Sequence, residues 1–105
     1  MSYSGEPNRK GSIGVEVRLY GELSLVAGSD RALVTLPEDS AVRDAVTALL
    51  HTCPSLKEFF VNESSDLHVE INLLLNGRSI RSLRGLETRL KDEDRLFALR
   101  AYGGG

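Results

Sequence analysis

The chain ends in three glycines, Gly103-Gly104-Gly105, shortly after a strand-like run from Arg95 to Ala101. Glycine has no Cβ, so a terminal glycine pair can pass through a slot that is too narrow for any side chain. The same lack of side chains leaves the carboxylate of Gly105 sterically open to attack. Four extended residues after Ala101 reach about 13 Å, at about 3.3 Å each. A domain of this kind can insert its own C-terminus into the active site of another protein.

A glycine-rich end can also be a flexible terminus or a linker without a function. The rest of the sequence offers few other groups for chemistry. Its one cysteine, Cys53, stands just before Pro54 at the end of a predicted helix, where nothing activates a thiol. His68 has no identifiable partner, and CxxC, HExxH, GxGxxG and P-loop patterns are absent. We therefore expect a protein that is not an enzyme and that binds no metal and no cofactor.

Composition narrows the class of protein further. The 105 residues carry a net charge of -2 with a pI near 5.7, and 41% of them are hydrophobic. This size predicts one domain, and this charge argues against direct binding of nucleic acid. The sequence has no apolar run near the roughly 18 residues that span a bilayer, and no signal-peptide pattern. With a single cysteine, we expect a cytoplasmic protein that does not contact a membrane.

The first part of the chain predicts a tail and two strands. Residues 1–14 contain almost nothing apolar and predict a flexible N-terminal tail, followed by a domain over residues 15–102 and a glycine tail over 103–105. From Val15, apolar and polar residues alternate through Tyr20, which is the period of a half-buried strand. A turn with a short apolar stretch follows, and a second strand runs from Arg31 to Leu36.

The apolar period then changes from two to 3.6 residues. An apolar stripe at helical spacing begins at Val42 and consists of Val42, Ala45, Val46, Leu49 and Leu50. We predict Ser40 as the N-cap, with Asp39 as the alternative, and Pro54 as the stop. A short helical turn is expected near Leu56 to Phe60, with a loop after it.

Three further strands are predicted after this loop. The third runs from Val69 to Leu75 and leads through Asn76-Gly77, a strong type I′ hairpin signal, into a short fourth strand. A connection from Ser82 to Glu93 precedes the last strand. The resulting order ββαβββ predicts an α+β fold, with a mixed sheet of about five strands and one main helix on one face.

One helix covers one face of a sheet, so the other face is informative. In the last strand Leu96 and Ala98 can face the helix, yet Phe97 and Leu99 are also apolar, as is Leu74 in the third strand. An uncovered apolar patch often marks a partner surface. The alternative is that the loop from Ser82 to Glu93 folds over these residues.

Taken together, these features resemble a known family. The strand order, the Asn76-Gly77 hairpin, the run over residues 90–94 and the terminal Gly104-Gly105 are similar to those of ubiquitin-like β-grasp proteins. The closest resemblance is to the sulfur-carrier branch, which includes the small subunit of molybdopterin synthase, the thiamin sulfur carrier and the small archaeal modifier proteins. The resemblance implies that the carboxylate of Gly105 is activated and that Gly104 threads the channel of an activating enzyme.

The sequence departs from the molybdopterin-synthase pattern near its end. That pattern has Asp-Gly-Asp before the last strand, where this chain has Asp92-Glu93-Asp94. It has Pro-Pro before the tail, where this chain has Arg100-Ala101, closer to the arginine-containing tail of ubiquitin. A third glycine is also present. Arg100 therefore joins Phe97, Leu99 and Leu74 as a candidate partner-binding residue, and protein modification and tRNA thiolation remain open beside molybdopterin synthesis.

The chemistry implied by the resemblance places no catalytic residue in this chain. An E1-like enzyme would use ATP to join Gly105 to AMP. A sulfur nucleophile would then give a thiocarboxylate, or a lysine amine would give an isopeptide bond. The implied partners are this enzyme and either the large subunit of molybdopterin synthase or lysine-bearing targets. The alternative from another class is a β-grasp interaction module that uses no C-terminal chemistry; a β-grasp ferredoxin would need four cysteines.

Overall fold

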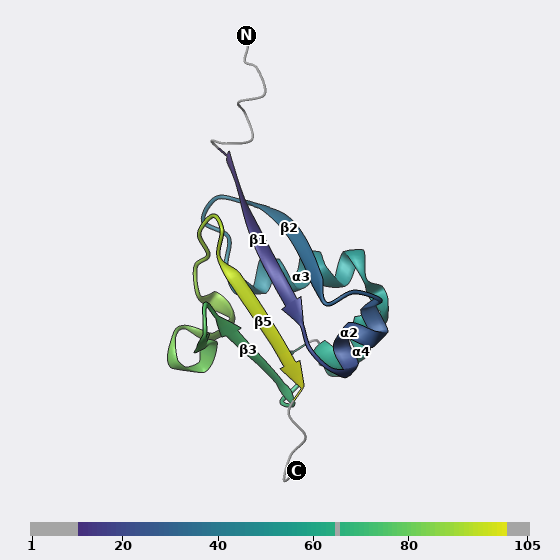
Figure 1. The fold of residues 1–105 in the computed structure, drawn as a ribbon. Helices are drawn as coiled ribbons and strands as arrows, with labels where there is room; N and C mark the ends of the chain where they lie inside the picture. The colour runs from purple at the N-terminus through teal and green to yellow at the C-terminus, as the bar shows by residue number, and fades with distance from the viewer. Residues whose placement is uncertain (1–10, 65, 101–105) are drawn as a thin grey trace.

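The computed structural model describes residues 11–64 and 66–100. Its elements are β1 (Ser12–Leu19), α2 (Glu22–Ala27), β2 (Arg31–Pro37), α3 (Val42–Thr52), α4 (Lys57–Phe60), β3 (Ile71–Leu75), β4 (Arg78–Ser79) and β5 (Arg95–Arg100), with 3-10 turns at Pro54–Leu56, Ile80–Ser82 and Gly85–Glu87. The strands form one five-stranded sheet in the order β2-β1-β5-β3-β4. β1 and β5 are parallel, and the other neighbours are antiparallel. Figure 1 shows α3 behind the sheet, which confirms the predicted mixed sheet with one main helix on one face.

The hydrophobic core lies between the sheet and α3. Along β1 every second residue is buried, because successive side chains of a strand point to opposite faces. The strand begins at Ser12, so the predicted tail is wrong for residues 12–14. Ile13 is buried and pairs with Leu36 of β2, and with Ser12 and Gly14 on either side it continues the alternation of the strand. Residues 1–10 and 101–105, on which the rest of the two predicted tails falls, lie outside the described residues.

The segment between β1 and β2 contains a helix that the sequence did not predict. α2 spans six residues, and only Leu23 among them is fully buried. Gly28 ends it in the left-handed conformation with φ 79°. Leu23, Val26 and Ala27 stand at helical spacing, and Val26 and Ala27 pack partly buried against the core. Six residues are too few for this period to be distinguished from a turn with an apolar stretch.

α3 follows its predicted stripe. Val42, Ala45, Val46 and Leu49 are its buried residues, and Leu50 is half-buried. The predicted N-cap, Ser40, is wrong by one residue, since the helix is capped at Ala41.

Two contacts replace the missing hydroxyl cap of α3. The Ala41 N–H donates to the Asp44 carboxylate at 2.8 Å, and the Val42 N–H donates to the carbonyl of Thr88 at 2.9 Å. The free donors of the first turn are thus satisfied from within the helix and from the connection before β5.

The second half of the sheet agrees with the predicted hairpin. Asn76 and Gly77 have φ angles of 51° and 96°, as a type I′ turn requires, and they join β3 to a two-residue β4. β3 starts at Ile71 instead of Val69, whose side chain is 79% exposed.

The acidic run before β5 ties several elements together. Asp92 accepts a hydrogen bond from the Gly14 N–H at 2.7 Å, and Asp94 accepts one from the Asn76 side chain at 2.9 Å. Glu93, between them, has a φ of 72°, which lies in the left-handed region. This is the position at which the molybdopterin-synthase pattern has glycine.

Replacing Leu49 with Ala should lower the free energy of unfolding by about 2–5 kcal/mol, because it leaves a cavity between α3 and the sheet. Leu49 is 1% exposed. Thr47→Ala, on the exposed side of the same helix, is the matched control and should change stability by less than about 0.5 kcal/mol. Chemical denaturation measures both; a loss below about 0.5 kcal/mol for Leu49→Ala would contradict its place in the core.

Glu93→Gly should raise the free energy of unfolding by up to about 1 kcal/mol, because a left-handed residue with a Cβ is strained by roughly this amount. Glu93→Ala keeps the Cβ and should bring no gain. Urea denaturation of the two variants separates backbone strain from loss of the carboxylate. A glycine variant that is no more stable than the alanine variant would show that the turn is unstrained.

Candidate functional site

The predicted site combines the terminal glycines with the strand that leads to them. Gly104 and Gly105 lie outside the described residues, and the described chain ends at Arg100, the last residue of β5. β5 is hydrogen-bonded to β1 on one side and to β3 on the other, and its final pair joins Arg100 to Ile71. The pairing with β1 ends at Ala98, so the last two residues of β5 are held by β3.

Phe97, Leu99 and Leu74 lie on one face of the sheet, as predicted. Phe97 is aligned with Leu74 of β3 and Arg18 of β1, and Leu99 is aligned with Asn72. All three apolar side chains are half-buried, whereas Leu96 and Ala98 of the same strand are buried toward α3. Within the described residues no helix lies in front of this face, which is turned toward the viewer in Figure 1. We call it the open face.

Tyr20 is a member of this site that the sequence did not predict. Its ring stacks on Phe97 with the centroids 6.1 Å apart and the planes at 17°. The sequence showed Tyr20 only as an outward residue at the end of the first strand. Tyr20 lies beside Phe97 because β1 pairs in parallel with β5, and no local sequence pattern indicates this pairing.

The open face also carries charges. Glu16 lies between two arginines, with Arg31 at 3.4 Å and Arg95 at 3.3 Å. Leu33, which pairs with Glu16 from the edge strand β2, is 77% exposed. The face therefore combines an apolar centre with an ionic border.

Arg100 lies on the opposite side of the sheet from Phe97 and Leu99. Its Nε donates to Glu70 at 3.1 Å, its Nη1 pairs with Glu22 of α2, and its guanidinium lies 5.3 Å from the centre of the Phe59 ring. Alternation along β5 places Arg100 on the same side of the sheet as Leu96 and Ala98. The side on which Arg100 lies could therefore have been predicted from the sequence. The structure thus separates Arg100 from the other three predicted partner-binding residues.

The loop from Ser82 to Glu93 does not cover the open face, so the predicted alternative is wrong. Leu86 packs against the hydrophobic core, Leu90 belongs to it, and Glu87 pairs with Arg43 of α3 at 2.7 Å. Thr88 accepts the hydrogen bond from the first turn of α3. The loop therefore packs along the helix side of the sheet.

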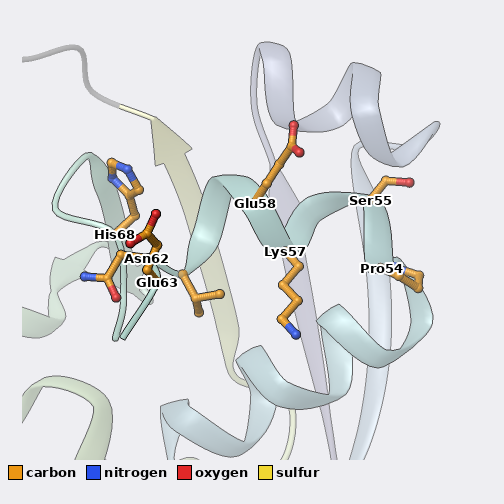
Figure 2. Close-up of a pocket in the computed structure, with 8 residues that line it drawn as sticks. Pro54, Ser55, Lys57, Glu58, Asn62, Glu63 and His68 are labelled. Atoms are coloured by element: carbon orange, nitrogen blue, oxygen red, sulfur yellow. The ribbon is translucent and has the colours of Figure 1, made fainter. Parts of the chain in front are cut away.

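Other polar residues do not assemble a reactive centre. A shallow pocket of about 630 Å³ is lined by Lys57, Glu58 and His68 among others. Figure 2 shows the Lys57 and Glu58 side chains pointing away from each other. His68 uses its Nδ1 to accept the Glu70 N–H at 3.2 Å, and Cys53 is half-buried at the end of α3. Within residues 11–64 and 66–100 no three His, Cys, Asp or Glu side chains gather as metal ligands would.

No helix among the described residues is long and apolar enough to cross a bilayer.

Comparison with known proteins places this geometry in a family. The model described as the ThiS family matches residues 17–105. The chain is 34% identical over 83 residues to small archaeal modifier protein 1 of Haloferax volcanii, covering 79% of this chain and 93% of that protein. The crystal structure of SAMP1 from the same organism gives a TM-score of 0.80 at 29% identity, covering 88% of this chain and 99% of that one.

Two further solved structures are similar. The solution structure of small archaeal modifier protein 1 from Methanosarcina acetivorans has a TM-score of 0.76 at 35% identity and covers 90% of this chain and 98% of its own. A chain of the BexX/CysO complex of Amycolatopsis orientalis has a TM-score of 0.70 at 27% identity, with coverages of 87% and 99%.

The family match spans both the sheet and the terminal glycines. The expected β-grasp fold is confirmed by the high structural similarity to these modifier proteins. The expected family is confirmed by the match over residues 17–105, and with it the expectation that the chain is a carrier and not an enzyme. The chain belongs to the ThiS family of ubiquitin-like sulfur carriers and small protein modifiers.

Proposed function

We propose that the carboxylate of Gly105 is the reactive group of this protein and that an E1-like enzyme activates it. The observation that supports this most is the family match, which runs through the last strand to residue 105. A carboxylate oxygen attacks the α-phosphorus of ATP, pyrophosphate leaves, and a Gly105 acyl-adenylate forms. The activating enzyme binds the ATP, while this chain binds no cofactor of its own.

The acyl-adenylate has two fates, which differ in the nucleophile. A persulfide can attack the carbonyl with loss of AMP, and a second thiol then cleaves the acyl disulfide to release the Gly105 thiocarboxylate. Alternatively, a lysine amine attacks, AMP leaves, and an isopeptide bond forms. The first fate supplies sulfur to molybdopterin synthesis, through the large subunit of the synthase, or to tRNA thiolation. The second attaches the chain to lysine-bearing proteins of the cytoplasm.

The open face is the proposed docking surface for the activating enzyme. The apolar centre of this surface consists of Phe97, Leu99, Leu74 and Tyr20. Phe97 and Leu99 lie on β5 itself, and Leu74 lies on its neighbour β3. A docked enzyme thus contacts the strand from which the glycine tail continues. Arg100, held by Glu22 and Glu70, contributes by fixing the last residue of β5 on the other side of the sheet.

Deletion of Gly104 and Gly105 should abolish adenylation, because the shortened tail no longer reaches the nucleotide. Thermal unfolding should barely change, since two glycines bury almost no apolar surface. ATP–pyrophosphate exchange with the cognate activating enzyme measures the first effect. Full exchange by the truncated protein would overturn the carrier proposal and favour an interaction module.

In the intact protein purified from its native host, a mass increase that corresponds to replacement of oxygen by sulfur would identify the sulfur-transfer branch.

Leu99→Asp should weaken activation at least tenfold, about 1.4 kcal/mol, because it places a charge in the apolar centre of the docking surface. Leu25→Asp is the matched control, since Leu25 lies on α2 and is 82% exposed. The KM for the protein in the exchange reaction gives the comparison, and circular dichroism checks the fold. An unfolded Leu99→Asp variant would make Leu99 a core residue, and an unchanged KM would make it a bystander.

A further inference from the structure

Among the residues that the structure describes, Arg18 is the one whose side chain has a buried polar atom without a hydrogen-bond partner. Its Nε is inaccessible to solvent and donates a hydrogen bond to no partner among the described residues. The nearest carboxylate in sequence on this face, Glu16, is already placed between Arg31 and Arg95. Within residues 11–64 and 66–100 the guanidinium of Arg18 forms no ion pair, although Glu16 lies only two residues away on the same strand.

Arg18 lies next to the apolar centre of the open face. It is aligned with Arg31 of β2 on one side and with Phe97 of β5 on the other, so it stands beside the ring that stacks on Tyr20. An unsatisfied buried donor destabilises a fold, and an apolar side chain of similar length would avoid this cost. The isolated domain therefore gains nothing from the Nε of Arg18.

The charge of the open face differs in sign from that of the whole chain. On its strands Arg18, Arg31 and Arg95 stand against Glu16, which gives a formal charge of +2 (3 − 1), whereas the chain carries −2. A cationic face with an apolar centre complements a surface that presents a carboxylate among apolar side chains. A phosphate backbone would leave Phe97, Leu99 and Leu74 without apolar contacts.

We infer that Arg18 binds a carboxylate of the activating enzyme at the centre of the docking interface, an inference that rests on the proposed function. The Nε of Arg18 is closed to solvent in the free domain, so the side chain changes rotamer when the enzyme docks. The edge of the guanidinium that carries Nε and one Nη then donates two parallel hydrogen bonds to the carboxylate. Docking buries this pair between the apolar side chains of the two proteins. Arg18 thereby selects an enzyme whose apolar docking surface contains an Asp or Glu at the matching point, and it disfavours one that lacks this carboxylate.

Arg18→Met tests the inference, because methionine keeps an unbranched apolar stem and removes every donor. The KM for the protein in ATP–pyrophosphate exchange should rise about 10- to 100-fold, the range that a hydrogen bond to a charged group contributes, with kcat unchanged. The Tm should stay the same or rise. Arg18→Lys keeps the charge but loses the planar fork, and it should recover only part of the affinity.

Arg43→Met is the matched control, because Arg43 is an exposed arginine of α3 on the other side of the sheet. Its KM should stay within about twofold of the parent protein, since exposed ion pairs contribute little. Replacing single acidic residues of the enzyme's docking surface with Arg should identify one variant that restores activation of Arg18→Glu.

Three outcomes would overturn the inference. The first is an unchanged KM for Arg18→Met, and the second is a Tm lowered by more than about 5 °C, which would make Arg18 a structural residue. The third is Arg18-dependent binding of a single-stranded oligonucleotide by the full chain, which would assign the site to phosphate. If deletion of Gly104 and Gly105 abolishes exchange while Arg18→Met leaves KM unchanged, the proposed function stands and this inference alone fails.

Discussion

The hydrogen bonding of β5 to a strand on each side is the constraint on which the rest of the structure depends. β5 pairs in parallel with β1 and antiparallel with β3, so its backbone is satisfied along both edges. A parallel neighbour requires a crossover, and here nearly the whole chain, including α3, lies between the two strands. That crossover covers one face of the sheet. The last strand is thus paired on both sides, and the C-terminal glycines follow shortly after it in the sequence.

The two faces of β5 differ in how deeply their side chains are buried. Leu96 and Ala98 are buried against α3 and contribute to stability, whereas Phe97 and Leu99 are left half-buried on the open face. An apolar side chain on an uncovered face contributes less to folding than one in the core, since less of its surface leaves the water. The proposed docking surface would account for the apolar residues on the open face, which the stability of the isolated domain does not require.

Two polar clusters fix the ends of β5. At its start, Asp92 and Asp94 bind the backbone of β1 and the side chain of Asn76 in the β3–β4 turn. At its end, Arg100 is held by Glu22 and Glu70. These contacts come from elements that are distant in sequence, so they set the direction of the strand relative to the whole domain. A carrier that presents its terminus to another protein needs this rigidity up to the point where the tail begins.

The sequence by itself determined the features that local periodicity and turn chemistry encode. The apolar stripe of α3, the alternation in β1, β3 and β5, and the Asn76-Gly77 turn were all predicted correctly, because each depends on neighbours within a few residues. The family resemblance, and with it the sulfur-carrier and modifier class, could also be recognised at this level. The sequence did not predict α2, because this helix has only six residues and fully buries only Leu23. It did not predict the cap at Ala41 either, because that cap depends on hydrogen bonds with Asp44 and Thr88.

Only the tertiary structure decided which strands are neighbours, and with them the composition of the candidate site. Alternation shows which residues of one strand share a face, but the pairing of β1 with β5 is a contact between distant segments and leaves no local pattern. That pairing brings Tyr20 and Arg18 to Phe97. The fold also decides the partners of Arg100, which are Glu22 of α2 and Phe59 of α4. The family and its glycine terminus could therefore be recognised from the sequence, while the composition of the open face required the fold.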